Sequence, residues 1–388
     1  MFREHRPLWV EINLDNLASN IRSIKSLLKP GTDYISVVKA DGYGHGAVEV
    51  AKTCMECGIN RLAVAMLDEA LELRNAGIKC NILILGYTPS NMADTIVEND
   101  ISQTCYSYEL AKALSDAGCR LGKTAKIHIA VDTGMGRIGF QPSFDDALIV
   151  KEISKLPNLK IEGIFTHFAV ADEKDKLYTK EQFKKYKAFL DILKSLKVDV
   201  GIKHVGNSAE ILDLPDFNLD AVRPGIIQYG LYPSDEVTKS KLDLKPVMSV
   251  KANIIHVKEV EKGTSISYGR KYITTRKSKI ATLPIGYADG YTRLLFGKAR
   301  VIINGKYAPV VGTICMDQCM VDATEAGDVK IGDEVIIMGS DGNISITAED
   351  IASQLGTINY EVVCMFSKRV PTVYIKNGKV YKVKNWLA

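Results

Sequence analysis

Lys39 stands directly after a short apolar run, residues 35–38, and glycines follow it at positions 42, 44 and 46. A lysine that emerges from an apolar core is partly desolvated, which favours the neutral amine that a Schiff base requires. Glycines allow backbone N–H groups to approach an anion such as phosphate closely. The structural alternatives are a solvated lysine at the end of a strand and an ordinary glycine-rich loop.

Charged and polar side chains follow four later apolar runs in the same way. They are Arg137 after residues 127–131, His167 after 161–165, Asn207 and Ser208 after 202–205, and Arg223 after 221–222. The carboxyl ends of the strands in a parallel barrel meet at one rim, so we expect these groups to converge. Their chemistry favours a ligand that carries phosphate. An ion pair between Arg137 and Asp132, and a core role for His204, are the structural alternatives.

The segments that must position these residues alternate between two periods. Short β-branched runs are separated by amphipathic segments, which is typical of β-α-β units and a parallel sheet. The runs are 35–38, 62–65, 82–85, 103–105, 127–131, 161–165, 202–205 and 221–222, and the amphipathic segments include 49–57, 68–76, 108–117 and 180–196. Eight such units predict a TIM-like (β/α)8 barrel. No GxGxxG motif follows the first run, which disfavours an open dinucleotide-binding sheet.

The pattern changes after residue 238 to short alternating runs with hairpin signals between them. These signals are the dipeptides at 304–305, 341–342 and 377–378, and helical periodicity is limited to residues 347–355. We therefore predict an α/β protein with two domains. Residues 1–238 form the barrel and residues 239–388 form a mostly antiparallel β domain, with which residues 1–14 could also pair.

The composition excludes several classes of protein. The 388 residues carry 50 basic and 46 acidic side chains, and this small, dispersed excess disfavours nucleic acid or an anionic membrane as a partner. No run approaches the roughly 18 apolar residues of a membrane helix, and the polar N-terminus does not resemble a signal peptide, so we expect a cytoplasmic protein. Cys54 and Cys57 form a CxxC without a second pair, so we expect buried thiols and no metal site.

Residues 38–46, with the sequence VKADGYGHG, closely resemble the pyridoxal-phosphate attachment motif of bacterial alanine racemases. Eight further motifs occur in the order of that family. They are DTGMGRIG at 132–139, THF at 166–168, GNS at 206–208, VRPGI at 222–226, SYGR at 267–270, GYADG at 286–290, CMDQ at 315–318 and INYE at 358–361. The similarity covers essentially the whole chain, and it implies a pyridoxal-phosphate enzyme of fold type III.

The resemblance implies an isomerase that interconverts L-alanine and D-alanine with two bases and supplies D-alanine for peptidoglycan. Lys39 corresponds to the lysine that binds the cofactor and exchanges the α-proton on one face, and Tyr268 to the base on the other face. Arg223 corresponds to the residue that faces the pyridine nitrogen, where an arginine can only donate and so weakens the ring as an electron sink. Arg137 corresponds to the residue that holds the substrate carboxylate.

Further site residues follow from the same resemblance. The cofactor contacts, mostly to its phosphate, correspond to Tyr43, His167, Asn207, Ser208, Gly225, Ile226 and Tyr360. Met316 matches a substrate contact that, like Tyr268, comes from the partner subunit, so a homodimer with two shared active sites is implied. The residues that match the substrate's access corridor are Asp172, Tyr287 and Arg293.

Two positions depart from the family pattern. Many relatives carry a lysine, often carbamylated, where this chain has Ala130, and that group orients the arginine matching Arg137. Many also carry an arginine in the corridor where this chain has Thr313. Neither change touches the two bases, so the departures concern the support of Arg137 and the substrate preference.

Three alternatives share parts of this pattern. A racemase of the same fold could act mainly on serine or another small amino acid, although Tyr360 argues against the larger pocket that this would need. A decarboxylase of this architecture would pair the pyridine nitrogen with a carboxylate, not with Arg223. A non-catalytic pyridoxal-phosphate-binding protein would be a single barrel, without the domain that carries Tyr268 and Met316.

Overall fold

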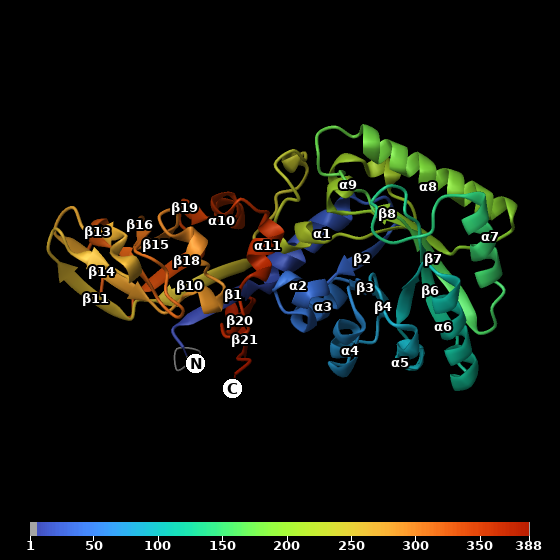
Figure 1. Ribbon diagram of the computed structural model, residues 1–388, viewed down its shortest axis with the longest axis horizontal. Coiled ribbons are helices and arrows are strands. Elements are labelled where there is room, and N and C mark those ends of the chain that lie inside the picture. Colours follow the sequence, from blue (N-terminus) through green and yellow to red (C-terminus); the bar gives the residue numbers. More distant parts are fainter. Residues whose placement is uncertain (1–5, 388) are drawn as a thin grey trace. The chain divides into compact units, whose positions relative to one another are not determined.

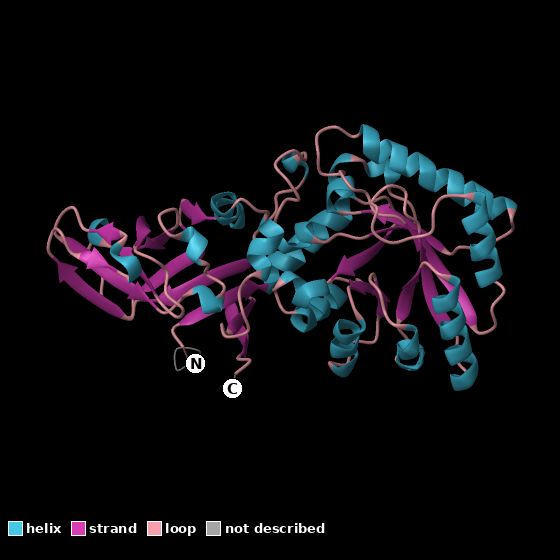
Figure 2. Ribbon diagram, viewed as in Figure 1, coloured by secondary structure: helices cyan, strands magenta, loops and turns pink. Residues whose placement is uncertain are grey.

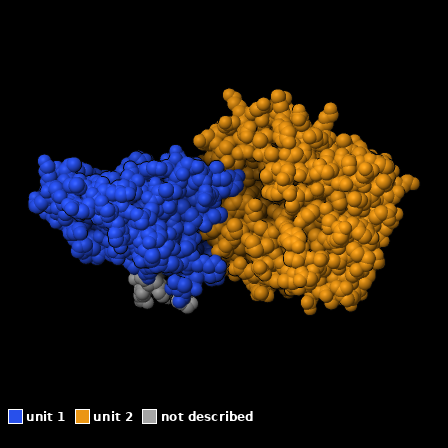
Figure 3. Space-filling model, viewed as in Figure 1, with its two compact units in different colours: residues 1–17, 246–388 blue, residues 18–245 orange. Residues whose placement is uncertain are grey.

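The computed structural model describes residues 6–387, which form two compact units (Figure 3). The barrel unit comprises residues 18–245, and the sheet unit comprises residues 6–17 together with 246–387. The sequence pattern changes after residue 238, whereas the barrel unit continues to residue 245. Lys241 Nζ donates a hydrogen bond to the carbonyl oxygen of Leu212, and the side chain of Leu242 is buried.

Eight parallel strands close the barrel unit, each paired with the next and the last paired with the first. Every predicted apolar run contributes one of these strands, so the predicted barrel fold is confirmed. The strands are β2 (Asp33–Val37), β3 (Arg61–Val64), β4 (Asn81–Ile84), β5 (Ser102–Cys105), β6 (Ala125–Ala130), β7 (Leu159–Phe165), β8 (Ile202–Gly206) and β9 (Ala221–Val222).

Helices flank the strands of this unit (Figure 1). In the sixth helix Leu110, Leu114 and Ala117 recur on one face and are buried, which is the pattern of a helix packed on a core. The hydroxyl of Ser107 caps its first turn, and Gly122 ends it in a left-handed conformation. The helices are α1 (Leu14–Leu27), α2 (Lys39–Tyr43), α3 (Ala47–Glu56), α4 (Leu67–Asn75), α5 (Ala93–Glu98), α6 (Tyr108–Leu121), α7 (Phe144–Ile153), α8 (Leu177–Ser195) and α9 (Ser208–Asp213).

An eleven-stranded sheet organises the sheet unit (Figure 2). The first strand of the chain, β1 (Leu8–Asn13), lies between β10 and β20, antiparallel to β10 and parallel to β20. Residues 1–5 of the segment 1–14 lie outside the described residues. The other strands are β10 (Met248–Asn253), β11 (His256–Val260), β14 (Ser278–Leu283), β15 (Arg300–Ile303), β16 (Lys306–Val311), β17 (Cys319–Asp322), β18 (Glu334–Asp341), β19 (Ile344–Ile346), β20 (Thr372–Lys376) and β21 (Lys379–Lys384), with a separate pair of β12 (Ser265–Ile266) and β13 (Tyr272–Ile273).

All three hairpin signals mark hairpins. The dipeptides 304–305 and 377–378 form two-residue turns in which both residues have positive φ, as type I′ turns require. The third turn is shifted by one residue to 342–343, because Asp341 still pairs with Ile344. The predicted helix is α10 (Ala348–Leu355), and α11 (Asn359–Cys364) follows it.

No helix in the described part of the chain is both long and apolar enough to cross a membrane. Residues 6–387 likewise contain no group of three or more histidine, cysteine or acidic side chains placed to hold a metal ion. Cys54 is buried, and burial raises the pKa of its thiol to about 12, which makes it unreactive at neutral pH.

Candidate active site

Lys39 lies where the chain leaves β2, at the start of an unusual backbone segment. Residues 40–44 all have φ between 52 and 77°, so they form a left-handed turn. Such a conformation costs a residue with a Cβ roughly 1–2 kcal/mol, and surrounding contacts must hold it. One of these contacts is a hydrogen bond of 2.6 Å from the N–H of Ala40 to Oε1 of Glu69. The turn thereby holds the backbone that carries Lys39.

Three of the residues expected to hold a phosphate meet at one place, which we call the cradle: Tyr43, Ser208 and Gly225. The N–H of Gly225 donates to Ser208 Oγ at 3.0 Å. A Cβ added to Gly225 would lie 2.7 Å from the Tyr43 hydroxyl oxygen, so only glycine leaves this space open. Asn207 caps the first turn of α9, and Ile226 begins a short 3-10 helix directly after the cradle.

Arg223 is buried just beyond β9 and is surrounded by neutral acceptors. Its NH1 donates to Nδ1 and to the carbonyl oxygen of His204, both at 2.8 Å. Its NH2 donates to the carbonyl oxygens of Thr166 at 2.8 Å and Val205 at 3.2 Å. These bonds from the described residues involve only the terminal nitrogens, which leaves Nε–H for a ligand. Burial lowers the pKa of Arg223 to about 10, so the guanidinium remains charged at neutral pH.

His167 lies close to three cationic side chains. Its Nδ1 is 3.5 Å from NH2 of Arg223. Burial, together with the positive charges of Arg223, Arg137 and Lys39, lowers the pKa of His167 to about 3. The imidazole is therefore neutral at neutral pH, and the structure brings Lys39, Arg137 and Arg223 into the surroundings of one histidine.

Arg137 is exposed on the loop that follows β6. The alternative of an ion pair with Asp132 is wrong, because no ion pair joins the two side chains; Asp132 Oδ1 instead accepts the backbone N–H groups of Gly134 at 2.9 Å and Gly136 at 3.0 Å. No hydrogen bond or ion pair to the Arg137 guanidinium occurs within residues 6–387. Ala130, which departs from the family pattern, is buried at the end of β6 and offers no side-chain group to orient Arg137.

Tyr268 and Met316 lie in the sheet unit, with 68% and 52% of their surfaces exposed. Thr313, the second departure from the family pattern, is buried and contacts the backbone of Tyr268. Its Oγ1 donates to the carbonyl oxygen of Tyr268 at 3.1 Å, while the hydroxyl of Ser267 donates to the carbonyl oxygen of Thr313. Thr313 therefore fixes the backbone of the segment that presents the candidate base.

The remaining predicted residues are divided between the units. Tyr287 and Arg293 are on exposed parts of the sheet unit, where Tyr360 lies partly buried in α11. Asp172 is in the barrel unit, and its carbonyl oxygen accepts a hydrogen bond of 2.6 Å from the Ser234 hydroxyl.

Sequence reasoning missed three residues of the barrel unit that the structure ties to the site. They are Glu69, which holds the left-handed turn, and His128 and Glu162, which connect to Arg223 through His204. A charged or titratable residue inside an otherwise apolar strand run is a signal that would have found the last two. Both lie within such runs, in β6 and β7.

Together the barrel, the lysine after its first strand, the cradle and the buried arginine are typical of a two-domain barrel enzyme whose site lies at the carboxyl ends of the strands. Residues 12–233 match the family description "Alanine racemase, N-terminal domain", and residues 247–374 match "Alanine racemase, C-terminal domain". The chain belongs to the alanine racemase family, which confirms the resemblance seen in its motifs.

Individual members of this family are similar in sequence to this chain over its full length. The chain is 57% identical to an alanine racemase of Clostridium novyi and 55% identical to alanine racemase 1 of Clostridium acetobutylicum, and each alignment covers 100% of both chains. Among solved structures, the alanine racemase of Clostridium difficile 630 is similar with a TM-score of 0.96 and 49% identity, over 98% of this chain and 99% of that one.

Proposed function

We propose that this protein interconverts L-alanine and D-alanine with pyridoxal 5′-phosphate as cofactor. The observation that carries the proposal is the grouping of Lys39, the cradle and Arg223 at one rim of the barrel, in a chain of the alanine racemase family. We place the reaction in the cytoplasm and expect its product to supply peptidoglycan synthesis.

The residues of the barrel unit fit this cofactor. The space that a Cβ on Gly225 would fill is lined by the hydroxyls of Tyr43 and Ser208, and such neutral donors suit a phosphate group. Arg223 has its Nε–H to offer to the pyridine nitrogen. When bound, the cofactor withdraws electrons from the α-carbon of the substrate and makes its proton acidic.

The protein's own groups then move the proton. Lys39, which also attaches the cofactor, takes or returns it on one face of the α-carbon, and Tyr268 acts on the opposite face. A free tyrosine has a pKa near 10, so a nearby cation must favour its phenolate. Arg137 fits this role and that of a carboxylate ligand, because it is exposed and within residues 6–387 nothing holds its guanidinium.

We further propose a homodimer whose two active sites are shared. Tyr268 and Met316 would enter the site of the partner subunit, and their high exposure in the single chain supports this arrangement. His167, Asn207, Ile226 and Tyr360 would complete the cofactor site. The corridor residues Asp172, Tyr287 and Arg293 would line the route of a small amino acid.

The test is incubation of the cofactor-loaded protein with L-alanine in D2O. We expect the α-proton signal in the NMR spectrum to disappear while the optical rotation of the same sample decays to zero. Exchange with unchanged rotation would contradict a two-base racemase. Absence of exchange would overturn alanine as the substrate, and L-serine in the same assay would then identify a serine racemase.

A further inference from the structure

A chain of hydrogen bonds runs from Arg223 through the interior of the barrel. NH1 of Arg223 lies 2.8 Å from Nδ1 of His204, and Nε2 of His204 lies 2.8 Å from Nδ1 of His128. Nε2 of His128 lies 3.4 Å from Oε2 of Glu162. The two histidines are on β8 and β6, are fully buried, and connect groups that belong to opposite ends of the strands.

Only one set of proton positions satisfies every link. Arginine can only donate, so Nδ1 of His204 must be the acceptor and its proton must be on Nε2. That proton is donated to Nδ1 of His128, whose own proton is then on Nε2 and is donated to Glu162. Burial lowers the pKa of both histidines, which keeps them neutral as this scheme requires. The chain therefore has a single direction, from the guanidinium to the carboxylate.

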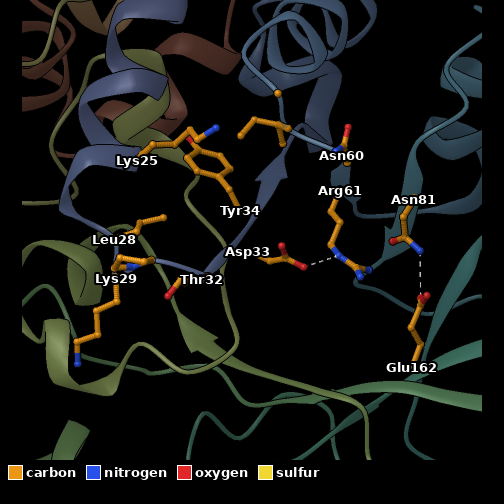
Figure 4. A pocket seen from close by; sticks show the side chains of 14 residues that line it. Lys25, Leu28, Lys29, Thr32, Asp33, Tyr34, Asn60, Arg61, Asn81 and Glu162 are labelled. Atoms are coloured by element: carbon orange, nitrogen blue, oxygen red, sulfur yellow. Dashed lines mark hydrogen bonds and ion pairs between the residues drawn. The ribbon is translucent and has the colours of Figure 1, made fainter.

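The far end of the chain is an ionised carboxylate. Oε2 of Glu162 also accepts hydrogen bonds from Ser102 at 2.7 Å and from Asn81 at 3.0 Å (Figure 4). Burial alone would raise the pKa of Glu162, but these donors and His128 hold it well below its usual range. Glu162 lines a cavity of about 640 Å³ at the amino-terminal ends of the strands, in which Asp33 pairs with Arg61 at 3.0 Å.

Arg223 needs such a counter-charge because a buried cation is costly unless it is paired. Its direct acceptors are neutral, and the other nearby carboxyl group does not supply the charge. That group is Glu210, which is fully buried; burial raises its pKa to about 8, and no hydrogen bond joins it to Arg223 within residues 6–387. The remaining acidic group that hydrogen bonds connect to Arg223 is Glu162.

We propose that Glu162, acting through His128 and His204, is the remote counter-charge of Arg223 and holds its guanidinium correctly oriented. Glu162, His128 and His204 are thus positioning residues for Arg223. This role rests on the proposed function in one respect only, namely that Arg223 faces the pyridine ring of the cofactor. Hydrogen bonds in such a chain polarise one another, so the carboxylate strengthens Nδ1 of His204 as an acceptor. The ring of His204 is kept in plane by stacking on Phe165, at 5.1 Å between centroids.

The first test needs neither cofactor nor substrate. In apoprotein labelled with 15N-histidine, long-range 15N–1H NMR identifies which ring nitrogen carries the proton, and single His→Gln variants assign the signals. We expect both His128 and His204 to carry the proton on Nε2 and not on Nδ1. A proton on Nδ1 of either ring would overturn the proposal, and this measurement holds even if the variants below fail to fold.

The second test compares Glu162→Gln with a matched control, Asp33→Asn, which removes a carboxylate from the same cavity but not from the chain. We expect Glu162→Gln to weaken the affinity of the apoprotein for pyridoxal phosphate about three- to tenfold and to shift the visible absorbance of the bound cofactor. We expect kcat to fall more than KM changes, and the control to behave like the wild type. Equal affinity and absorbance in all three proteins would overturn the proposal. Since neither affinity nor absorbance depends on turnover of alanine, failure of the proposed function would be seen separately.

Discussion

The carboxylate of Glu69 accepts the backbone N–H of Ala40, the residue directly after Lys39, at 2.6 Å. Its other oxygen accepts the N–H of Ala65 at 2.7 Å. One side chain on α4 thus ties together the segments that leave β2 and β3. Because residues 40–44 are held in a left-handed conformation, this tie opposes the relaxation of the turn that carries Lys39.

Replacing Glu69 by glutamine should loosen this turn. The amide has one acceptor oxygen, so at least one of the two N–H groups loses its partner, and we expect the free energy of unfolding to fall by about 1–2 kcal/mol. Racemisation should slow because Lys39 is less well positioned. Thermal unfolding and the initial rate measure the two effects. Asp68→Asn, an exposed acid in the same helical turn, is the control, and an equal effect of both substitutions would contradict the role of Glu69.

The cradle predicts a steric effect on cofactor affinity. In Gly225→Ala the new methyl group would lie 2.7 Å from the Tyr43 hydroxyl oxygen, so the loop or the tyrosine must move. We expect roughly five- to 160-fold weaker binding of pyridoxal phosphate, measured by absorbance titration, because an overpacked site typically costs about 1–3 kcal/mol. Removing the hydroxyl as well, in Tyr43→Phe with Gly225→Ala, should cost less than the sum of the single effects. Strict additivity would show that the two residues do not collide.

Tyr268→Phe should separate catalysis from folding. The substitution keeps the ring and removes only the hydroxyl, which makes no hydrogen bond within residues 6–387 of its own chain, so we expect an almost unchanged melting temperature and affinity for pyridoxal phosphate. Racemisation should be lost because no group remains to act on the second face. The D2O experiment measures the loss of racemisation, and a thermal scan of the same preparation measures the melting temperature. Racemisation at the wild-type rate would exclude Tyr268 as the second base.

Glu210 predicts how stability depends on pH. Burial raises the pKa of this carboxyl from 4.5 to about 8, so between these values the folded protein binds a proton that the unfolded chain does not. Stability contributed by this group is therefore present at low pH and lost as the pH rises through about 8. Glu210→Gln should lack that loss, so its stability relative to the wild type should increase from pH 5 to pH 8. Denaturant unfolding at several pH values checks this, with the exposed Glu181→Gln as a control that should show no such trend.

Local patterns were sufficient to predict the fold. Most barrel strands are short, apolar and β-branched, and they alternate with segments of helical period, so the alternation itself predicts the architecture. The type I′ turns at 304–305 and 377–378 depend on two adjacent residues only, which is why they were correctly located. The same reasoning placed Ser208 and Arg223 at the ends of strands.

Contacts between distant segments could not be predicted in this way. Glu69 reaches Ala40 across two elements, and Glu162 reaches Arg223 through two other side chains, so no local spacing encodes either relation. Thr313 was considered only as a corridor position, whereas its hydroxyl supports the backbone at Tyr268. These relations arise from side-chain geometry after the strands have assembled.

The position of β1 between β10 and β20 also constrains how the protein is made. A ribosome synthesises β1 first, but its neighbours begin only at Met248 and Thr372. All the strands of the barrel leave the ribosome in that interval and can close on themselves. Meanwhile the strand Leu8–Asn13 lacks its first partner until β10 has been made and its second until β20 has been made, so it is exposed to aggregation during most of translation.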